Sequence, residues 1–128
     1  MERLRIASGS PWESRVGYSR ALRAGQLVCV SGTTGTDASG AVVDPGAYEQ
    51  TKKALERIAT ALRDAGARVE DVVRTRIFVT DIDDWEPVAR AHAEMFAQVR
   101  PACSMVQVAR LIAPEIVVEI EADAVVAD

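Results

Sequence analysis

Three carboxylates lie at alternating positions near the end of the chain, at Glu119, Glu121 and Asp123. Residues two apart in a β-strand point to the same face, so these side chains share one face of the strand predicted there. A carboxylate near an apolar interface has a raised pKa and can act as a general acid or base. For Glu121 and Asp123 the favoured interpretation is a ladder of charges, answered by Arg74 and Arg76 on another predicted strand.

The cysteines and the histidine are the other candidates for chemistry. A nucleophilic cysteine needs a cation or a helix N-terminus to stabilise its thiolate, and the sequence places neither firmly beside Cys103. A small neutral pocket residue is therefore the favoured interpretation of Cys103. Cys29 lies inside an apolar run and is predicted to be in the core. His92, the single histidine, lies on the apolar face of a predicted helix and is predicted to be packed there or at an interface edge.

Neither a metal site nor a phosphate-binding loop is predicted. No Cys/His ligand spacing is present. Residues 31–36 (Ser-Gly-Thr-Thr-Gly-Thr) have the composition of a phosphate-binding loop, but they lack its Gly-Lys-Ser/Thr ending and do not lead directly into a helix. We expect a plain loop there, in which Gly32 allows a ligand to approach the backbone or takes an unusual φ.

The composition is that of one globular domain, residues 1–128, with 48% hydrophobic and 27% charged residues. The net charge is −4 and no segment concentrates Lys and Arg, which argues against nucleic acid as a partner. No apolar run reaches the ~20 residues that a membrane span requires, and the first residues show no export signal. We therefore expect no membrane association and, with two cysteines, free thiols in a reducing cytoplasm.

Hydrophobic periodicity predicts five strands and two helices in the order β-β-α-β-α-β-β, after an irregular segment 1–13. The strands are predicted at 14–22, 26–31, 69–80, 103–111 and 116–126. The first two strands are predicted to form a hairpin, and residues 32–46 a loop.

Both predicted helices have one apolar face. The first runs from about Tyr48 to Ala65, with Pro45 near its start and Gly66 just past its end. The second begins after an N-cap at Asp83 or Asp84 and ends before Pro101. Its apolar face is predicted to comprise Trp85, Val88, His92, Met95, Phe96 and Val99.

These elements predict an α+β fold, a two-layer sandwich in which the helices cover one face of a single mixed sheet. In strand 69–80 the apolar face is predicted to comprise Val73, Thr75, Ile77 and Val79, and the mixed face Val72, Arg74, Arg76 and Phe78. In strand 116–126 the apolar face is predicted to comprise Ile116, Val118, Ile120, Ala122 and Ala124. A second face that mixes charges with apolar side chains suits a subunit interface, so we expect an oligomer packed through it.

Four segments carry motifs that occur together in one family: Gly17-Tyr18, Val30-Ser31-Gly32, residues 72–81, and residues 100–111 with 119–126. They resemble, in order, the Gly-Pro-Tyr, Ser-Gly, Asp-Val-Val-Lys-Thr-Thr-Val-Phe-Leu and Pro-Ala-Arg-Ser motifs of the Rid family (YjgF/YER057c/UK114). Ser31 follows Tyr18 by thirteen residues, which is the family's spacing. The resemblance covers nearly the whole chain.

The resemblance implies a chorismate-mutase-like subunit of a homotrimer, with a cleft between each pair of subunits. In deaminating members an arginine binds the substrate carboxylate, and a glutamate on the last strand positions the attacking water. Carried over by position, the resemblance assigns to the cleft Tyr18, Ser31, Gly32, Cys103, Met105 and Glu119. Glu119 matches the catalytic glutamate, with Glu121 as the alternative because one extra residue lies in the preceding turn.

Cys103 stands where the family has its arginine. An arginine–carboxylate pair is bidentate and strong, whereas cysteine offers no positive charge. A free carboxylate would lose about 2–5 kcal/mol of binding without a replacement. The substrate is therefore predicted to be less anionic than a 2-imino acid, or to be held differently.

The leading hypothesis is a homotrimer that hydrolyses an imine, an enamine or a related small metabolite, with no metal or organic cofactor. The alternative is a non-catalytic trimer that binds a small metabolite or a partner protein in the same clefts, which the absence of the arginine favours. Ribonuclease activity, attributed to some family members, is a third possibility, against which the acidic net charge argues.

Overall fold

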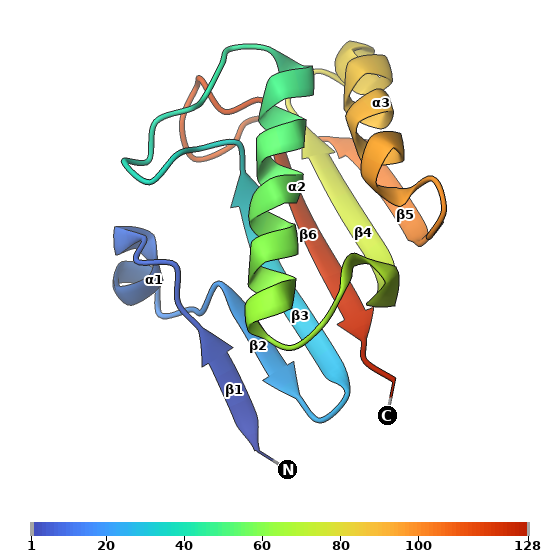
Figure 1. Ribbon diagram of the computed structural model, residues 1–128. Helices are drawn as coiled ribbons and strands as arrows, with labels where there is room; N and C mark the ends of the chain where they lie inside the picture. The colour runs from blue at the N-terminus through green and yellow to red at the C-terminus, as the bar shows by residue number, and fades with distance from the viewer. Residues whose placement is uncertain (1, 128) are drawn as a thin grey trace.

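A mixed sheet of six strands, in the order β1-β2-β3-β6-β4-β5, forms one layer of the computed structural model, which describes residues 2–127 (Figure 1). All neighbouring strands are antiparallel except β4 and β5, which are parallel. The strands are β1 (Arg3–Ile6), β2 (Ala21–Ala24), β3 (Leu27–Thr34), β4 (Val72–Val79), β5 (Ala102–Gln107) and β6 (Val118–Val125). The helices are α1 (Pro11–Val16), α2 (Ala47–Asp64) and α3 (Trp85–Phe96), with short 3-10 turns η1 (Val69–Asp71) and η2 (Ile82–Asp84).

The long helices α2 and α3 cover one face of the sheet, which confirms the predicted two-layer α+β sandwich (Figure 1). Apolar side chains of the helices and of the sheet's inner face form one core; its largest fully buried members are Leu55, Ile58, Leu62, Val28, Ile77, Val79, Val88, Val118 and Ile120. The apolar face predicted for the last strand is buried throughout. Among the described residues, no helix combines the length and hydropathy of a membrane span.

The N-terminal segment differs from the prediction. Residues 1–13 were expected to be irregular and 14–22 to form a strand, but the structure contains β1, paired with β2, and the short helix α1. The Ser10 hydroxyl caps α1 by accepting a hydrogen bond from the Trp12 amide, and Pro11 occupies the first turn. Gly17, with φ of 91°, ends the helix. These local start and stop signals outweigh the weak alternation that suggested a strand.

A bulge in β4 alters the predicted faces of that strand. The register against β6 shifts between Val72 and Arg74. Val72 is therefore buried (3% exposed), whereas Val73, predicted to be internal, is 48% exposed. The remaining positions follow the predicted alternation, with Thr75, Ile77 and Val79 buried.

Trp85 also departs from its predicted place in the core. It is the first residue of α3 and is 54% exposed, because this end of the helix extends past the tip of β4 (Figure 1). Val88 and Phe96 are buried as predicted, and His92, Met95 and Val99 are partly buried.

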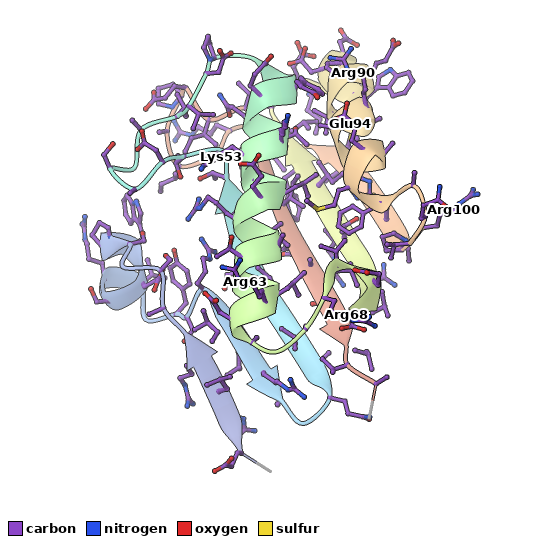
Figure 2. The ribbon with its side chains drawn as sticks, viewed as in Figure 1. Lys53, Arg63, Arg68, Arg90, Glu94 and Arg100 are labelled. Carbon is purple, nitrogen blue, oxygen red and sulfur yellow. The ribbon has the colours of Figure 1, made fainter. Side chains whose placement is uncertain are left out.

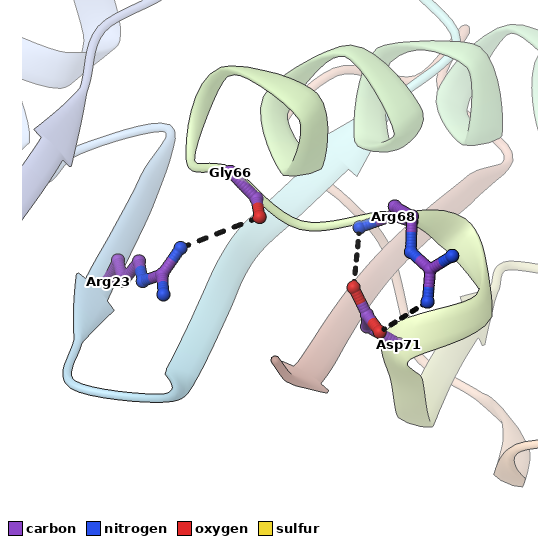
Figure 3. Close-up of polar contacts among 4 residues, drawn as sticks. All are labelled: Arg23, Gly66, Arg68 and Asp71. Carbon is purple, nitrogen blue, oxygen red and sulfur yellow. Dashed lines mark hydrogen bonds and ion pairs between the residues drawn. The ribbon is translucent and has the colours of Figure 1, made fainter. Parts of the chain in front are cut away.

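Arginines fix the C-terminal end of α2. Arg23 on β2 donates a hydrogen bond to the Ala65 carbonyl at 2.9 Å. It also donates to the Gly66 carbonyl at 3.5 Å (Figure 3). Just beyond, Arg68 forms a 3.5 Å ion pair with Asp71 (Figure 3). Helix carbonyls that lack intrahelical partners thus bond to the β2–β3 hairpin, which fixes α2 relative to β3.

The two ends of the described chain lie at one end of the sheet. β1 begins and β6 finishes at the lower edge in Figure 1, whereas α1 lies at the other end of β1. The end of β3 at Thr34 and the start of β6 at Val118 therefore lie away from both termini (Figure 1).

Gln50, in the first turn of α2, joins three segments and is fully buried. Its amide nitrogen donates to the carbonyls of Asp44 and Glu115, each at 2.9 Å, and its amide oxygen accepts from the Val117 amide at 3.0 Å. The helix start, the loop after β3 and the turn before β6 are thereby held together. The neighbouring Thr51 hydroxyl is buried without a hydrogen-bond partner.

We expect opposite effects from two substitutions at these neighbouring positions. Gln50→Met leaves three backbone groups without their partner and should lower the free energy of unfolding by about 2 kcal/mol or more. Thr51→Val removes an unpaired buried hydroxyl and should leave stability unchanged or raise it by up to ~1 kcal/mol. Urea denaturation followed by circular dichroism measures both; equal losses for the two variants would contradict this account.

Candidate functional site

The site lies where β3 extends past the end of its neighbour β2. β2 pairs with β3 only as far as Val30, so residues 31–34 have no neighbouring strand on that edge. Two arginine side chains occupy it instead. Arg20 Nη2 donates to the Gly32 carbonyl at 2.5 Å, and Arg57 Nη1, from α2, donates to the Thr34 carbonyl at 2.9 Å. The arginines thus satisfy backbone acceptors that a strand would otherwise pair.

Gly32 lies in a bulge that brings Glu119 against the backbone. The register between β3 and β6 shifts between Val30 and Thr33. A Cβ at position 32 would lie only 2.5 Å from Glu119 Oε2, so a larger residue would displace the carboxylate. Gly32 was expected to let a ligand approach its backbone. In the structure, the group that approaches it is the Glu119 carboxylate of the same chain.

Glu119 is partly buried on the sheet face that the helices leave open. Its pKa is raised above the usual range mainly by burial, and also by the nearby carboxylate of Glu121. The guanidinium of Arg20 acts in the opposite direction and lowers this pKa. A carboxylate whose pKa is raised in this way is better suited to exchange protons with a substrate than an ordinary surface carboxylate.

Tyr18 and Ser31 line a shallow depression, whose lining does not include Glu119. The depression has a volume of about 590 Å³ and is also lined by Arg5, Glu13 and Cys29, among others. The Ser31 hydroxyl donates to the Ser19 carbonyl at 2.7 Å. The Tyr18 ring lies below the guanidinium of Arg20, 5.7 Å from its centroid. Four predicted site residues, Tyr18, Ser31, Gly32 and Glu119, thus lie in one region.

Cys103 and Met105 lie elsewhere in the same chain. Both are on the edge strand β5, which β4 and β6 separate from β3. Cys103 pairs with Thr75 and Met105 with Ile77, and these partners are buried beneath the helices. Glu119 pairs with Phe78, on the opposite face. Within one chain the predicted site residues therefore form two separate groups.

The remaining sequence candidates have structural roles. Arg76 forms ion pairs with Glu121 and Asp123, at 3.3 and 3.2 Å, which confirms the predicted charge ladder for that arginine. His92 is packed as predicted, with its Nε2 2.9 Å from the Thr75 hydroxyl. Cys29 was predicted to be in the core but is exposed, because it lies on the open face of β3. Within residues 2–127, no cluster of His, Cys, Asp and Glu could hold a metal ion.

Three charged residues of the site were missed from the sequence: Glu13, Arg20 and Arg57. Arg20 had a signal, since a charged residue inside a predicted hairpin strand needs either solvent or a partner. Glu13 fell in a segment expected to be irregular, and its buried carboxylate accepts from the Ser8 amide (3.1 Å) and the Ser8 hydroxyl. Arg57 lies on a mixed flank of α2, and no sequence pattern distinguishes it from its charged neighbours.

The raised pKa of Glu119 predicts that this carboxylate destabilises the protein at neutral pH. The folded pKa lies above the unfolded value of about 4.3, so the folded state binds more protons between the two values and stability falls as pH rises through that window. Glu119→Gln should therefore melt at a higher temperature than the wild type at about pH 8, and the difference should vanish at about pH 4. Glu121→Gln, which breaks an ion pair with Arg76, should give no such gain. Thermal melts across this pH range test the sign; a less stable Glu119→Gln protein at the upper end would refute it.

Comparisons with known proteins agree with this geometry. The family model for Endoribonuclease L-PSP matches residues 9–126. A crystal structure from Mycobacterium tuberculosis, described as a member of the YjgF/YER057c/UK114 family, is 53% identical. It covers 98% of this chain and 100% of its own, with a TM-score of 0.91.

Curated relatives point the same way. An uncharacterized protein of Streptomyces coelicolor is 38% identical over 94% of this chain and 90% of its own. The 3-aminoacrylate deaminase RutC of Acinetobacter baylyi is 38% identical over 80% of this chain and 82% of its own. Further relatives are named 2-iminobutanoate/2-iminopropanoate deaminases. The chain therefore belongs to the Endoribonuclease L-PSP family, as its resemblance to the YjgF/YER057c/UK114 (Rid) proteins predicted.

Proposed function

We propose that the protein hydrolyses a reactive imine, or an enamine after its conversion to the imine, with Glu119 as the general base. The observation that carries this proposal is the position of Glu119, partly buried against Gly32, the residue after Ser31, with a raised pKa. Relatives that are named as deaminases of an enamine and of imines support the reaction class.

The reaction needs one water and one group that moves its proton. Glu119, as a carboxylate, accepts a proton from the water that adds to the C=N carbon and passes it to the nitrogen, which gives a carbinolamine. It then accepts the proton of the new hydroxyl and passes it to the same nitrogen as the C–N bond breaks, so both protons of the water leave with the nitrogen. The products are a carbonyl compound and ammonia. A base with a pKa nearer to neutral is better matched to both proton transfers than an ordinary carboxylate. No step requires a metal or an organic cofactor.

We also propose that the active unit is a homotrimer whose clefts join the two groups of site residues. One chain supplies Tyr18, Ser31, Gly32 and Glu119, and its neighbour supplies Cys103 and Met105 from the β5 edge. Support comes from the separation of the groups within one chain and from large apolar side chains that are nearly half exposed on the sheet: Leu27, Val106 and Val125. Such side chains suit a subunit interface.

A trimer that binds a small metabolite without turning it over is the second candidate, which the neutral Cys103 at the position of the family's arginine favours. Ribonuclease activity is not proposed, because the net charge is −4 and no basic segment is present to bind a phosphate backbone. We place the protein in the cytoplasm, where the thiols of Cys29 and Cys103 would stay reduced.

Imine hydrolysis tests the proposed reaction directly. Imines are generated from several amino acids by an amino-acid oxidase, and the remainder is trapped with semicarbazide. The wild type should accelerate hydrolysis, and Glu119→Gln should lower the rate by about 100-fold or more, because it removes the general base. Glu121→Gln is the matched control, since its carboxylate lies on the same face but pairs with Arg76, and it should keep its activity.

The same assay separates the two candidates. Full activity of Glu119→Gln would refute the mechanism. Saturable ligand binding without turnover in the wild type would favour the binding protein. Activity gained only by Cys103→Arg would mean that the scaffold can hydrolyse free imino acids but does not use them as its native substrates.

Subunit mixing tests the composite cleft. Glu119→Gln removes the base from one group, and Cys103→Trp places a bulky ring in the other; each variant alone should be inactive. After the two are unfolded and refolded together at equal amounts, about a quarter of the clefts should combine intact groups and regain activity. Two variants refolded separately and then combined without exchange are the control. Activity of Cys103→Trp alone, or no recovery on mixing, would contradict a cleft shared between chains.

A further inference from the structure

Arg20 is buried without a carboxylate partner. Its side chain is only 5% exposed, yet its one hydrogen bond in the described chain is the bond to the Gly32 carbonyl. The Nε group is fully enclosed and makes no hydrogen bond. The ion pairs found within residues 2–127 all involve other arginines. A buried guanidinium with an unpaired donor is costly, and a bound anion would offset part of that cost.

Arg57 adds a second positive charge at the same place. Its Nη1 donates to the Thr34 carbonyl and to the Thr36 hydroxyl, both at 2.9 Å, and it too forms no ion pair in the described part of the chain. Burial lowers its pKa, and the neighbouring charge of Arg20 lowers it further. Burial likewise lowers the pKa of Arg20. Two guanidinium groups that repel each other while partly desolvated favour the binding of an anion between or beside them.

The carboxylates nearby do not fill this role. Glu13 is within electrostatic range of both arginines and Glu119 of Arg20, as their opposing effects on the arginine pKa values show. The Glu13 oxygens accept hydrogen bonds from the Ser8 amide and hydroxyl, and neither glutamate approaches an arginine within ion-pair distance. Tyr18, whose ring lies below Arg20, is the remaining neighbour. The pair therefore retains donors for an external anion.

We propose that Arg20, assisted by Arg57, binds the carboxylate of an anionic imine substrate, in place of the arginine that is absent at Cys103. Arg20 donates to the carbonyl of Gly32, and Glu119 lies against the same glycine, so the anchor and the base lie beside a single residue. A planar carboxylate matches the fork of donors that a guanidinium presents. The assignment of the carboxylate to a substrate rests on the proposed imine hydrolysis; the anion site itself does not.

Binding of a non-reacting acid tests the anion site without turnover. The probe is 2-oxobutanoate, compared with its uncharged methyl ester, by isothermal titration calorimetry on the assembled protein. The wild type should bind the acid and discriminate against the ester. Arg20→Gln should weaken binding of the acid by about thirtyfold or more and leave the ester unchanged. Arg57→Gln should have a smaller effect of the same kind.

Two controls keep the test specific. The Arg20→Gln side chain stays polar but is too short to reach the Gly32 carbonyl as Nη2 does, so a thermal melt verifies the fold. Arg63→Gln removes an exposed arginine on the outer surface of α2 and should behave as the wild type (Figure 2). If Arg20→Gln does not fold, Arg57→Gln and the acid–ester comparison still decide. Equal binding of acid and ester by the wild type, or unchanged acid binding in both arginine variants, would overturn the proposal.

Kinetics add a readout that a purely structural role would not change. Arg20 lowers the pKa of Glu119, so Arg20→Gln should move the acidic limb of the pH profile of kcat/KM to higher pH. Its KM for an anionic imine should rise, while KM for the imine of an amino-acid ester should not. If both arginine variants turn over the substrate like the wild type, the proposed reaction is supported and the anion site is rejected. If the protein binds the carboxylate but shows no turnover, the anion site is supported and the proposed reaction is rejected.

Discussion

The unequal lengths of β2 and β3 are the constraint on which the site depends. Where β2 ends, the carbonyls of Gly32 and Thr34 still need donors, because a buried backbone acceptor without a partner is destabilising. Arg20 and Arg57 supply them, and this hydrogen bonding draws two cations to the edge at which the bulge brings Glu119 onto Gly32. The side chains that bond to the open edge of β3 are thus also those that give the site its positive charges.

Around Gly32, the positively and negatively charged side chains shift each other's pKa values. Burial raises the pKa of Glu119, and Arg20 offsets part of that effect. Arg20 in turn is shielded by the Tyr18 ring and by the electrostatic influence of Glu13, which Ser8 holds in place. The two arginines and two glutamates of the site carry formal charges that balance when all four are ionised.

Much of the fold could be predicted from hydrophobic periodicity, whereas three charged residues of the candidate site, Glu13, Arg20 and Arg57, could not be predicted from the sequence. Long elements with clear patterns, such as α2 and β6, were predicted nearly to the residue, because many apolar contacts must agree on one face. Short elements depend on caps and turns, so β1 and α1 were missed, and Glu13 with them. Gly32 and Glu119 were found through motif resemblance. Arg20 and Arg57 were not, because what makes them part of the site is a strand edge left open in three dimensions.

The position of the chain ends has a practical consequence for handling the molecule. β1 starts and β6 finishes at the same end of the sheet, whereas α1 and the Gly32 bulge lie toward the other (Figure 1). An affinity tag or a surface tether attached at either end would lie away from the Gly32 bulge. Because both ends lie at one end of the sheet, a linker between them could support circular permutation, with new termini opened in the exposed loop at residues 37–41.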